Sequence, residues 1–179
     1  MIVNLIRGKE KMENFHTISI LVTNEAGVLS RIVDLFSGRG YNIESLTVAP
    51  TIDKLYSRVT IVTGGDEAAI EQINKQLNRL VPVIKVADLN IKEALEREIA
   101  LIKIQVKDEE KSDILRIAEA TNAKIIDITD KTYILQAVGD EKQIQALIEL
   151  VRPYSVKEFV RSGKVAISRN NQFTNLKNL

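Results

Sequence analysis

The chain of 179 residues is 45% hydrophobic and carries 25 Lys and Arg against 24 Asp and Glu, a formal net charge of +1. This near-neutral balance provides no overall field for nucleic acid or anionic lipid. The absence of cysteine excludes disulfides and thiol nucleophiles, and a single histidine excludes a multi-His metal site. The length suits one or two domains.

The two ends of the chain differ from the rest in composition. Residues 1–14 have a brief apolar stretch that soon becomes charged, so it is typical of neither a signal peptide nor a membrane span. We expect a loosely attached extension at residues 1–14, a polar tail at residues 171–179, no membrane association and a cytoplasmic location.

The first half of the chain alternates strand and helix patterns. Apolar residues alternate over 16–23, which predicts a half-buried strand, and recur at helical spacing over 28–38. Gly64-Gly65-Asp66 provides a break and an N-cap for a further helix. The predicted order is strand 16–23, helix 28–38, strands 42–49 and 55–63, a helix after Asp66, and a strand at 83–89.

The second half repeats this order with different residues. Asp130-Lys131 separates two short strands as the turn of a hairpin. The charged Lys92–Glu98 segment is the expected boundary between the halves. The predicted elements are a strand at 98–107, a helix at 109–121, strands at 124–129 and 132–138, a helix at 140–151, and strands near 155–160 and 164–168.

The repeated order predicts an α+β protein made of two consecutive ferredoxin-like βαββαβ sandwiches. In each, both helices cover one face of an antiparallel sheet. The open faces and edges then need another cover, and pairing of subunits is the usual solution. We therefore expect an oligomer.

A candidate binding site is formed by two segments around the first helix. Backbone amides at the helix start are able to hold a carboxylate, and two asparagine carbonyls are able to accept from an ammonium. Gly27 is expected because a Cβ there would crowd the turn and the ligand. The same patterns also occur as ordinary helix caps and turns, so both interpretations stay open on spacing alone. The candidate residues are Asn24, Ala26, Gly27, Val28, Leu29, Asn42 and Ile43.

Catalytic, metal and nucleic-acid sites are poorly supported. His16 has no carboxylate or hydroxyl partner nearby in sequence, which favours a structural role. Asp127 and Asp130 flank a predicted turn, as solvated acids do. The strand at 55–63 has one aromatic residue, whereas RNA recognition on such a sheet requires several. We expect no catalytic residue, no metal site and no nucleic-acid partner.

Several motifs resemble a known family. Asn24-x-x-Gly27-x-Leu29-Ser30-Arg31 and the uninterrupted Arg39–Pro50 run look like an ACT domain, and more narrowly like the small regulatory subunit of acetolactate synthase (acetohydroxyacid synthase). The similarity continues through Glu96-Arg97-Glu98-Ile99 and ends with Arg161-Ser162-Gly163…Ser168-Arg169. It covers about residues 16–169, and it implies an ACT regulatory domain at 15–91 and a C-terminal ferredoxin-like domain at 97–170.

The resemblance implies a non-catalytic subunit that activates a large catalytic subunit and confers feedback inhibition by a branched-chain amino acid, valine first. Thiamine diphosphate, Mg and FAD are then expected on the large subunit, with no cofactor on this chain. The effector is expected between the ACT domains of a homodimer, with residues 24–29 from one chain and Asn42-Ile43 from its neighbour. A stand-alone amino-acid-sensing module that controls gene expression is the alternative.

Overall fold

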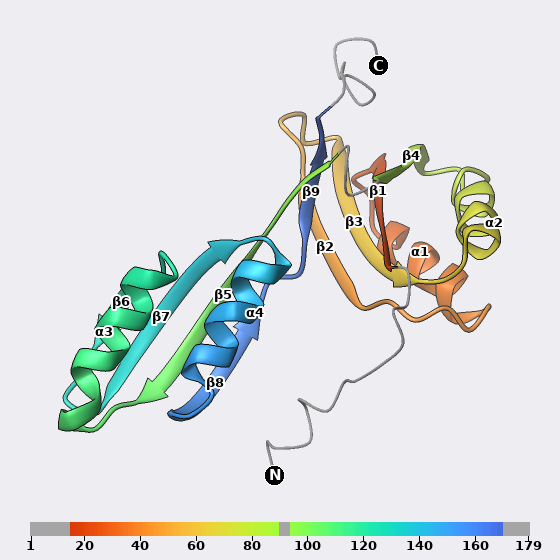
Figure 1. The fold of residues 1–179 in the computed structure, drawn as a ribbon. Helices are drawn as coiled ribbons and strands as arrows, with labels where there is room; N and C mark the ends of the chain where they lie inside the picture. Colours follow the sequence, from red (N-terminus) through yellow and green to blue (C-terminus); the bar gives the residue numbers. More distant parts are fainter. Residues whose placement is uncertain (1–14, 90–93, 170–179) are drawn as a thin grey trace. The chain divides into compact units, whose positions relative to one another are not determined.

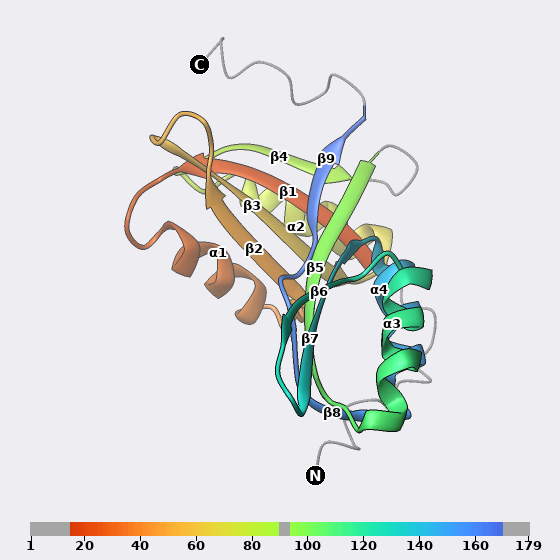
Figure 2. The same cartoon turned by 90° about the vertical axis from the view of Figure 1, so that its left-hand side faces the viewer.

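The computed structural model describes residues 15–89 and 94–169, which form two compact units divided between Asn90 and Ile91. Each unit is an antiparallel sheet with two helices on one face (Figure 1, Figure 2). The predicted α+β class with two ferredoxin-like sandwiches is confirmed. The predicted N-terminal extension and polar tail lie outside the described residues.

The first unit follows the predicted order, and its sheet has the strand order β2-β3-β1-β4. Neighbouring strands are antiparallel, with Thr23 opposite Tyr56 and His16 opposite Thr63 between β1 and β3. The elements are β1 (Phe15–Thr23), α1 (Val28–Ser37), β2 (Ser45–Pro50), β3 (Tyr56–Gly64), α2 (Glu67–Leu77) and β4 (Val83–Leu89).

The helix α1 forms where apolar residues recur every three to four positions. Its buried stripe consists of Val28, Ile32 and Phe36, which pack in the same core as Ile18 and Ile20 of β1. The helix ends in a Schellman motif, because Tyr41 N donates to Phe36 O at 3.0 Å and Gly40 N donates to Ser37 O at 3.1 Å. Gly40 has φ +72°, so the prediction that it stops this helix is confirmed.

The second unit repeats the arrangement and adds one strand. Its sheet has the order β6-β7-β5-β8, and β9 pairs with the first part of the long strand β5. The elements are β5 (Ala94–Gln105), a 3-10 turn (Asp108–Glu110), α3 (Lys111–Ala120), β6 (Lys124–Ile128), β7 (Thr132–Gly139), α4 (Glu141–Val151), β8 (Ser155–Arg161) and β9 (Val165–Ser168).

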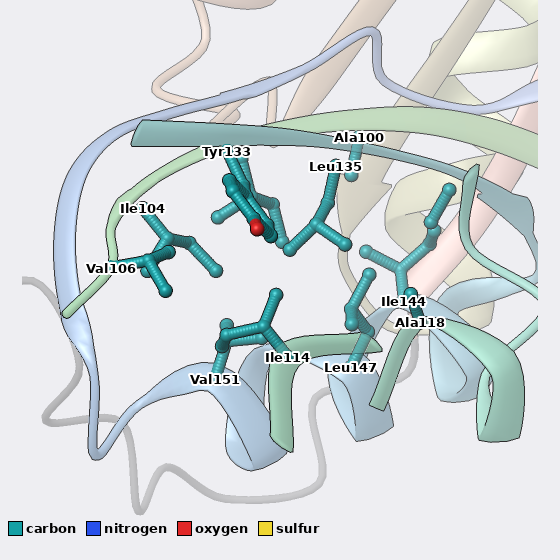
Figure 3. Packing of buried hydrophobic residues seen from close by; sticks show 12 residues of the cluster. Ala100, Ile104, Val106, Ile114, Ala118, Tyr133, Leu135, Ile144, Leu147 and Val151 are labelled. Carbon is teal, nitrogen blue, oxygen red and sulfur yellow. The ribbon is translucent and has the colours of Figure 1, made fainter. Parts of the chain in front are cut away.

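The core of the second unit lies between its sheet and its two helices. Tyr133 and Leu135 of β7 point toward Ile114 of α3 and Leu147 of α4 (Figure 3). Ile114, Leu135 and Leu147 are all fully buried. This cluster is separate from the core of the first unit, so each unit has the hydrophobic centre of an independent domain.

Three boundaries differ from the predictions. The strand β5 begins at Ala94, four residues before the predicted start, although Glu96–Glu98 had the composition of a charged linker. The strand β2 begins at Ser45, so Asn42–Glu44 are not part of it although the predicted strand covered 42–49. A 3-10 turn over Asp108–Glu110 precedes α3 where one continuous helix was expected.

Candidate functional site

The loop between β1 and α1 is fixed at its first residue. Asn24 N donates to Leu55 O at 2.7 Å, and Asn24 Nδ2 donates to Lys54 O at 2.9 Å. Both acceptors belong to the loop between β2 and β3. The amide nitrogen of Asn24 is thus used within the chain, which leaves its side-chain carbonyl oxygen as an acceptor for a ligand.

Gly27 gives α1 an open N-terminus. It is the N-cap residue at φ +82°, it makes no side-chain cap, and the first turn contains no acidic residue. Among the hydrogen bonds of the described residues, none has the amide of Gly27, Leu29 or Ser30 as its donor. These N–H groups and the helix dipole together favour an anion.

The expectation that a Cβ on Gly27 would crowd the turn is wrong. A Cβ built there would have nothing within 4 Å among the described residues. The glycine is required by its left-handed backbone conformation, which other L-residues adopt at a cost of about 1–2 kcal/mol.

The three predicted apolar residues are placed differently from one another. Val28 is buried in the core beneath α1, so its side chain is not accessible to a ligand. Leu29 is 36% exposed on the outer side of the first turn. Ile43 is half-buried against the same core. Leu29 and Ile43 therefore have accessible apolar surface that a ligand could contact. Ala26 is exposed beside Gly27.

Asn42 lies in the segment between α1 and β2. Thr63 Oγ1 donates to Asn42 O at 2.7 Å, and Glu44 N donates to Val62 O at 2.9 Å, which fixes this segment on the end of β3. The Asn42 side-chain amide donates to the Glu44 carboxylate. Glu44 was missed as a candidate, although its exposed carboxylate adds a negative charge beside the Asn42 carbonyl.

The structure does not bring the two predicted segments together within one chain. The first is bonded to Leu55, just before β3 starts, and the second to Val62 and Thr63, near its end. Tyr56 and Thr63 are about 23 Å apart at a rise of about 3.3 Å per strand residue. That span is far longer than one amino acid, so a single small ligand cannot contact both segments of one chain.

Among the other polar side chains, His16 and Arg161 each lie against a carboxylate. His16 Nδ1 lies 3.0 Å from Asp88 Oδ2, a carboxylate partner that sequence proximity did not reveal. Asp127 and Asp130 are exposed near the β6–β7 turn, as predicted. In the second unit, Arg161 makes two hydrogen bonds to the buried carboxylate of Glu98.

Lys164 completes a second charged cluster in the same unit. Its ammonium lies 3.3 Å from Glu96 Oε2 and 2.8 Å from Glu141 Oε2. Burial lowers the pKa of Lys164, but the hydrogen bond to Glu141 and the two acidic charges outweigh it and leave the pKa raised. Three of the basic residues in 152–169, Arg152, Arg161 and Lys164, are therefore paired with neighbouring acids.

Within residues 15–89 and 94–169, no helix is long and apolar enough to span a bilayer. No cluster of three or more His, Asp or Glu residues suitable for a metal ion occurs in these ranges.

The comparisons with known proteins identify both units. The family model for the AHAS small subunit-like ACT domain matches residues 18–85, and the model for the small subunit of acetolactate synthase matches residues 97–170. The acetolactate synthase small subunit of Aquifex aeolicus is 46% identical over 155 residues, covering 86% of this chain and 81% of the relative. The chain belongs to the acetolactate synthase small-subunit family.

Two other members of the family cover similar lengths. The acetolactate synthase isozyme 3 small subunit of Escherichia coli is 45% identical over 156 residues, covering 87% of this chain and 96% of the relative. The crystal structure of the small subunit from Thermotoga maritima has 38% identity and a TM-score of 0.82, covering 88% of this chain and 98% of that one. Both units of this small subunit thus have the fold of a solved family member.

Proposed function

We propose that this chain is the non-catalytic regulatory subunit of an acetolactate synthase. It binds a branched-chain amino acid, valine first, between the ACT domains of two chains and imposes feedback inhibition on a large catalytic subunit that it also activates. Membership in the small-subunit family supports the regulatory role in branched-chain amino-acid biosynthesis. Thiamine diphosphate, Mg and FAD are assigned to the large subunit, and the cytoplasmic location stays a prediction.

The observation that carries the two-chain site is the separation of its halves along β3. The outer edge of β2 pairs with no other strand among the described residues, so it is available to a second copy. Antiparallel pairing of two β2 strands about a twofold axis would set the Asn42 end of one strand beside the Pro50 end of the other. Pro50 leads into the loop that is bonded to Asn24. One twofold axis thereby creates two complete sites.

Each complete site has a group for every part of the ligand. The amides at the start of α1 would bind the carboxylate, aided by the helix dipole. The side-chain carbonyls of Asn24 and of the partner's Asn42 would accept from the ammonium, with the charge of Glu44 nearby. Leu29 and Ile43 would contact the aliphatic side chain.

A ligand that bridges two chains stabilises the dimer conformation it prefers. By linkage, a catalytic subunit that binds better to one conformation responds to the effector. We expect valine to bind with micromolar to millimolar affinity, about −4 to −8 kcal/mol.

A mixed dimer tests the shared site. Gly27→Asp chains and Asn42→Ala chains should each bind valine poorly as homodimers. In a dimer of one chain of each kind, one site carries both substitutions and the other carries neither. Calorimetry on the purified mixed dimer should therefore recover wild-type affinity at half the wild-type stoichiometry.

Two results would contradict the proposal. Failure of the mixed dimer to recover any valine binding would show that the two segments do not form one site across chains. Absence of binding by the wild-type chain to valine, leucine and isoleucine would remove the effector role altogether.

A further inference from the structure

The three most exposed large apolar side chains of the described residues gather at one end of the first unit. Ile52 is 98% exposed, Val81 95% and Leu55 69%. Single exposed apolar residues are common on protein surfaces, but a group of them indicates an interaction site.

Hydrogen bonds to the end of β1 fix the position of this group. Asn24 N donates to Leu55 O, and Thr23 N donates to Pro82 O at 2.9 Å, beside Val81. Because β3 and β4 flank β1, Leu55 and Pro82 are about 10 Å apart at about 4.8 Å per strand spacing. Figure 2 shows the β2–β3 loop, the end of β1 and the start of β4 at the same end of the sheet.

The loop that carries Ile52 is built as an ordered turn. Asp53 accepts from Thr51 Oγ1 at 2.8 Å and from Tyr56 N at 3.1 Å through its carbonyl oxygen, and from Leu55 N at 3.0 Å through its carboxylate. These bonds hold the backbone while the two apolar side chains project outward. An apolar anchor on an ordered loop loses little entropy on binding.

The shape of this surface argues for a concave partner. A hairpin tip with a nearly fully exposed side chain is convex, and two convex tips cannot bury each other. Three side chains also provide far less than the roughly 800 Å² per partner of a stable interface. They suit anchors that enter pockets on a larger protein.

A second copy of the chain paired along β2 cannot cover the whole of this surface. In the proposed dimer, the copies pair along the edge of β2, whereas Val81 precedes β4 at the opposite edge of the sheet. The name of the family implies a large subunit as a further partner. The effector site and the β2 edge leave the contact surface for that large subunit unassigned on this chain.

We propose that Ile52, Leu55 and Val81 form the surface that docks into an apolar groove of the catalytic large subunit. This inference rests on the proposed function. It also supplies a path for regulation, because Asn24 belongs to the β1–α1 loop of the proposed effector site and both of its nitrogens donate to the β2–β3 loop that carries Ile52 and Leu55. A ligand that repositions Asn24 acts directly on the residues that hold the catalytic partner.

The test compares two double variants of the full-length chain. Ile52→Glu with Val81→Glu adds two charges to the docking surface. Ile128→Glu with Val138→Glu is the matched control, because these side chains of the second unit are 59% and 58% exposed. Affinity for the cognate large subunit is measured by biolayer interferometry, valine binding by calorimetry, and mass by sedimentation.

We expect the first double variant to bind the large subunit at least tenfold more weakly, and the control to stay within threefold of wild type. Valine affinity and dimer mass should be unchanged in both. Normal binding by the first variant, or equal loss in the control, would overturn the docking surface alone. Dissociation of the dimer would assign the surface to a second copy. Failure of the wild-type chain to bind the large subunit would overturn both proposals.

Discussion

In the first unit, α1 begins at Gly27 with no side-chain cap and no acidic residue in its first turn. In the second unit, α3 is preceded by the 3-10 turn Asp108–Glu110, in which all three residues are acidic. Glu110 Oε2 accepts from Lys107 N at 3.0 Å, and Asp108 pairs with Lys111 at 2.6 Å. The same position in the βαββαβ order thus has an open helix start in one unit and, in the other, a helix start preceded by an acidic 3-10 turn that is capped by Glu110.

This difference gives the two units different capacities to bind an anion at the first helix. The partial positive charge at a helix start is available to a ligand carboxylate only where the protein's own carboxylates do not satisfy it. Three acidic residues at the start of α3 would repel an amino-acid carboxylate. The difference therefore favours the first unit over the second for the proposed effector site.

The largest expected effect comes from giving the first unit an acidic helix start like that of the second. Gly27→Asp should weaken valine binding by about 100-fold or more, since a fixed carboxylate then occupies and repels the anion position. Isothermal calorimetry on the purified subunit measures this directly. Activation of the large subunit should be mostly retained.

Gly27→Ala is the matched control for this substitution. It imposes at least as much left-handed backbone strain as Asp, without a charge, and a Cβ there has nothing within 4 Å among the described residues. If Gly27→Ala abolished valine binding as completely as Gly27→Asp, backbone conformation rather than charge would be responsible. Full valine sensitivity of the Gly27→Asp holoenzyme would show that the site is misplaced.

A smaller effect is expected at the other half of the site. Asn42→Ala should weaken valine binding by about 1–3 kcal/mol, because a hydrogen bond to the charged ammonium is lost. The inhibition constant of the holoenzyme for valine is the measurement, and an unchanged constant would rule out this role. Asn78→Ala serves as a surface control at the end of α2, outside both segments.

The starts of the second helices provide the next comparison. Both follow a Gly-Asp pair, in which Asp66 or Asp140 accepts from a backbone amide in the first turn. A Cβ on Gly139 would lie 2.8 Å from Gln143 Cβ, whereas a Cβ on Gly65 would make an ordinary 3.4 Å contact with Ala69. The second unit is therefore packed more tightly at this point.

We expect Gly139→Ala to destabilise the protein by about 1–3 kcal/mol through overpacking. Gly65→Ala should be neutral or should stabilise by up to about 1 kcal/mol, because it restricts the unfolded chain. Urea unfolding followed by circular dichroism measures both. Equal effects from the two substitutions would show that the close contact at Gly139 relaxes without cost.

Much of the fold was predictable because its signals are local. Periodicity indicated α1 with Ile32 and Phe36 among its apolar positions, and the glycine at position 40 correctly marked the end of that helix. The start of β5 was not predictable in this way. Glu96 and Glu98 resemble linker residues until Lys164 and Arg161, more than 60 positions away, are placed beside them.

The candidate site was predictable as two segments but not as an arrangement. Sequence spacing suggested the open start of α1 and the position of Asn42 after the end of that helix. It did not reveal that these segments lie at opposite ends of β3, since that depends on strand order and register. Nor did it show that Val28 is buried in the core, because the first apolar residue of a helix can point toward the core or toward solvent.

The smallest expected effect concerns pH and again separates the two helix starts. The hydrogen bond and charge of Lys111 lower the pKa of the Asp108 carboxyl below its ordinary value of 3.8. A carboxyl with a lowered pKa stabilises the folded state above that ordinary value, and the contribution is lost as the pH falls through the lowered pKa. Acidification below about pH 3.8 should therefore loosen the start of α3 but not that of α1, whose first turn has no acid.

Carbon chemical shifts of residues 109–112 and 28–30, followed by NMR from pH 5 to pH 2, measure this difference. Added salt should reduce it, because the pair is exposed. Equal loosening of both helix starts would show that the acids around α3 contribute nothing local.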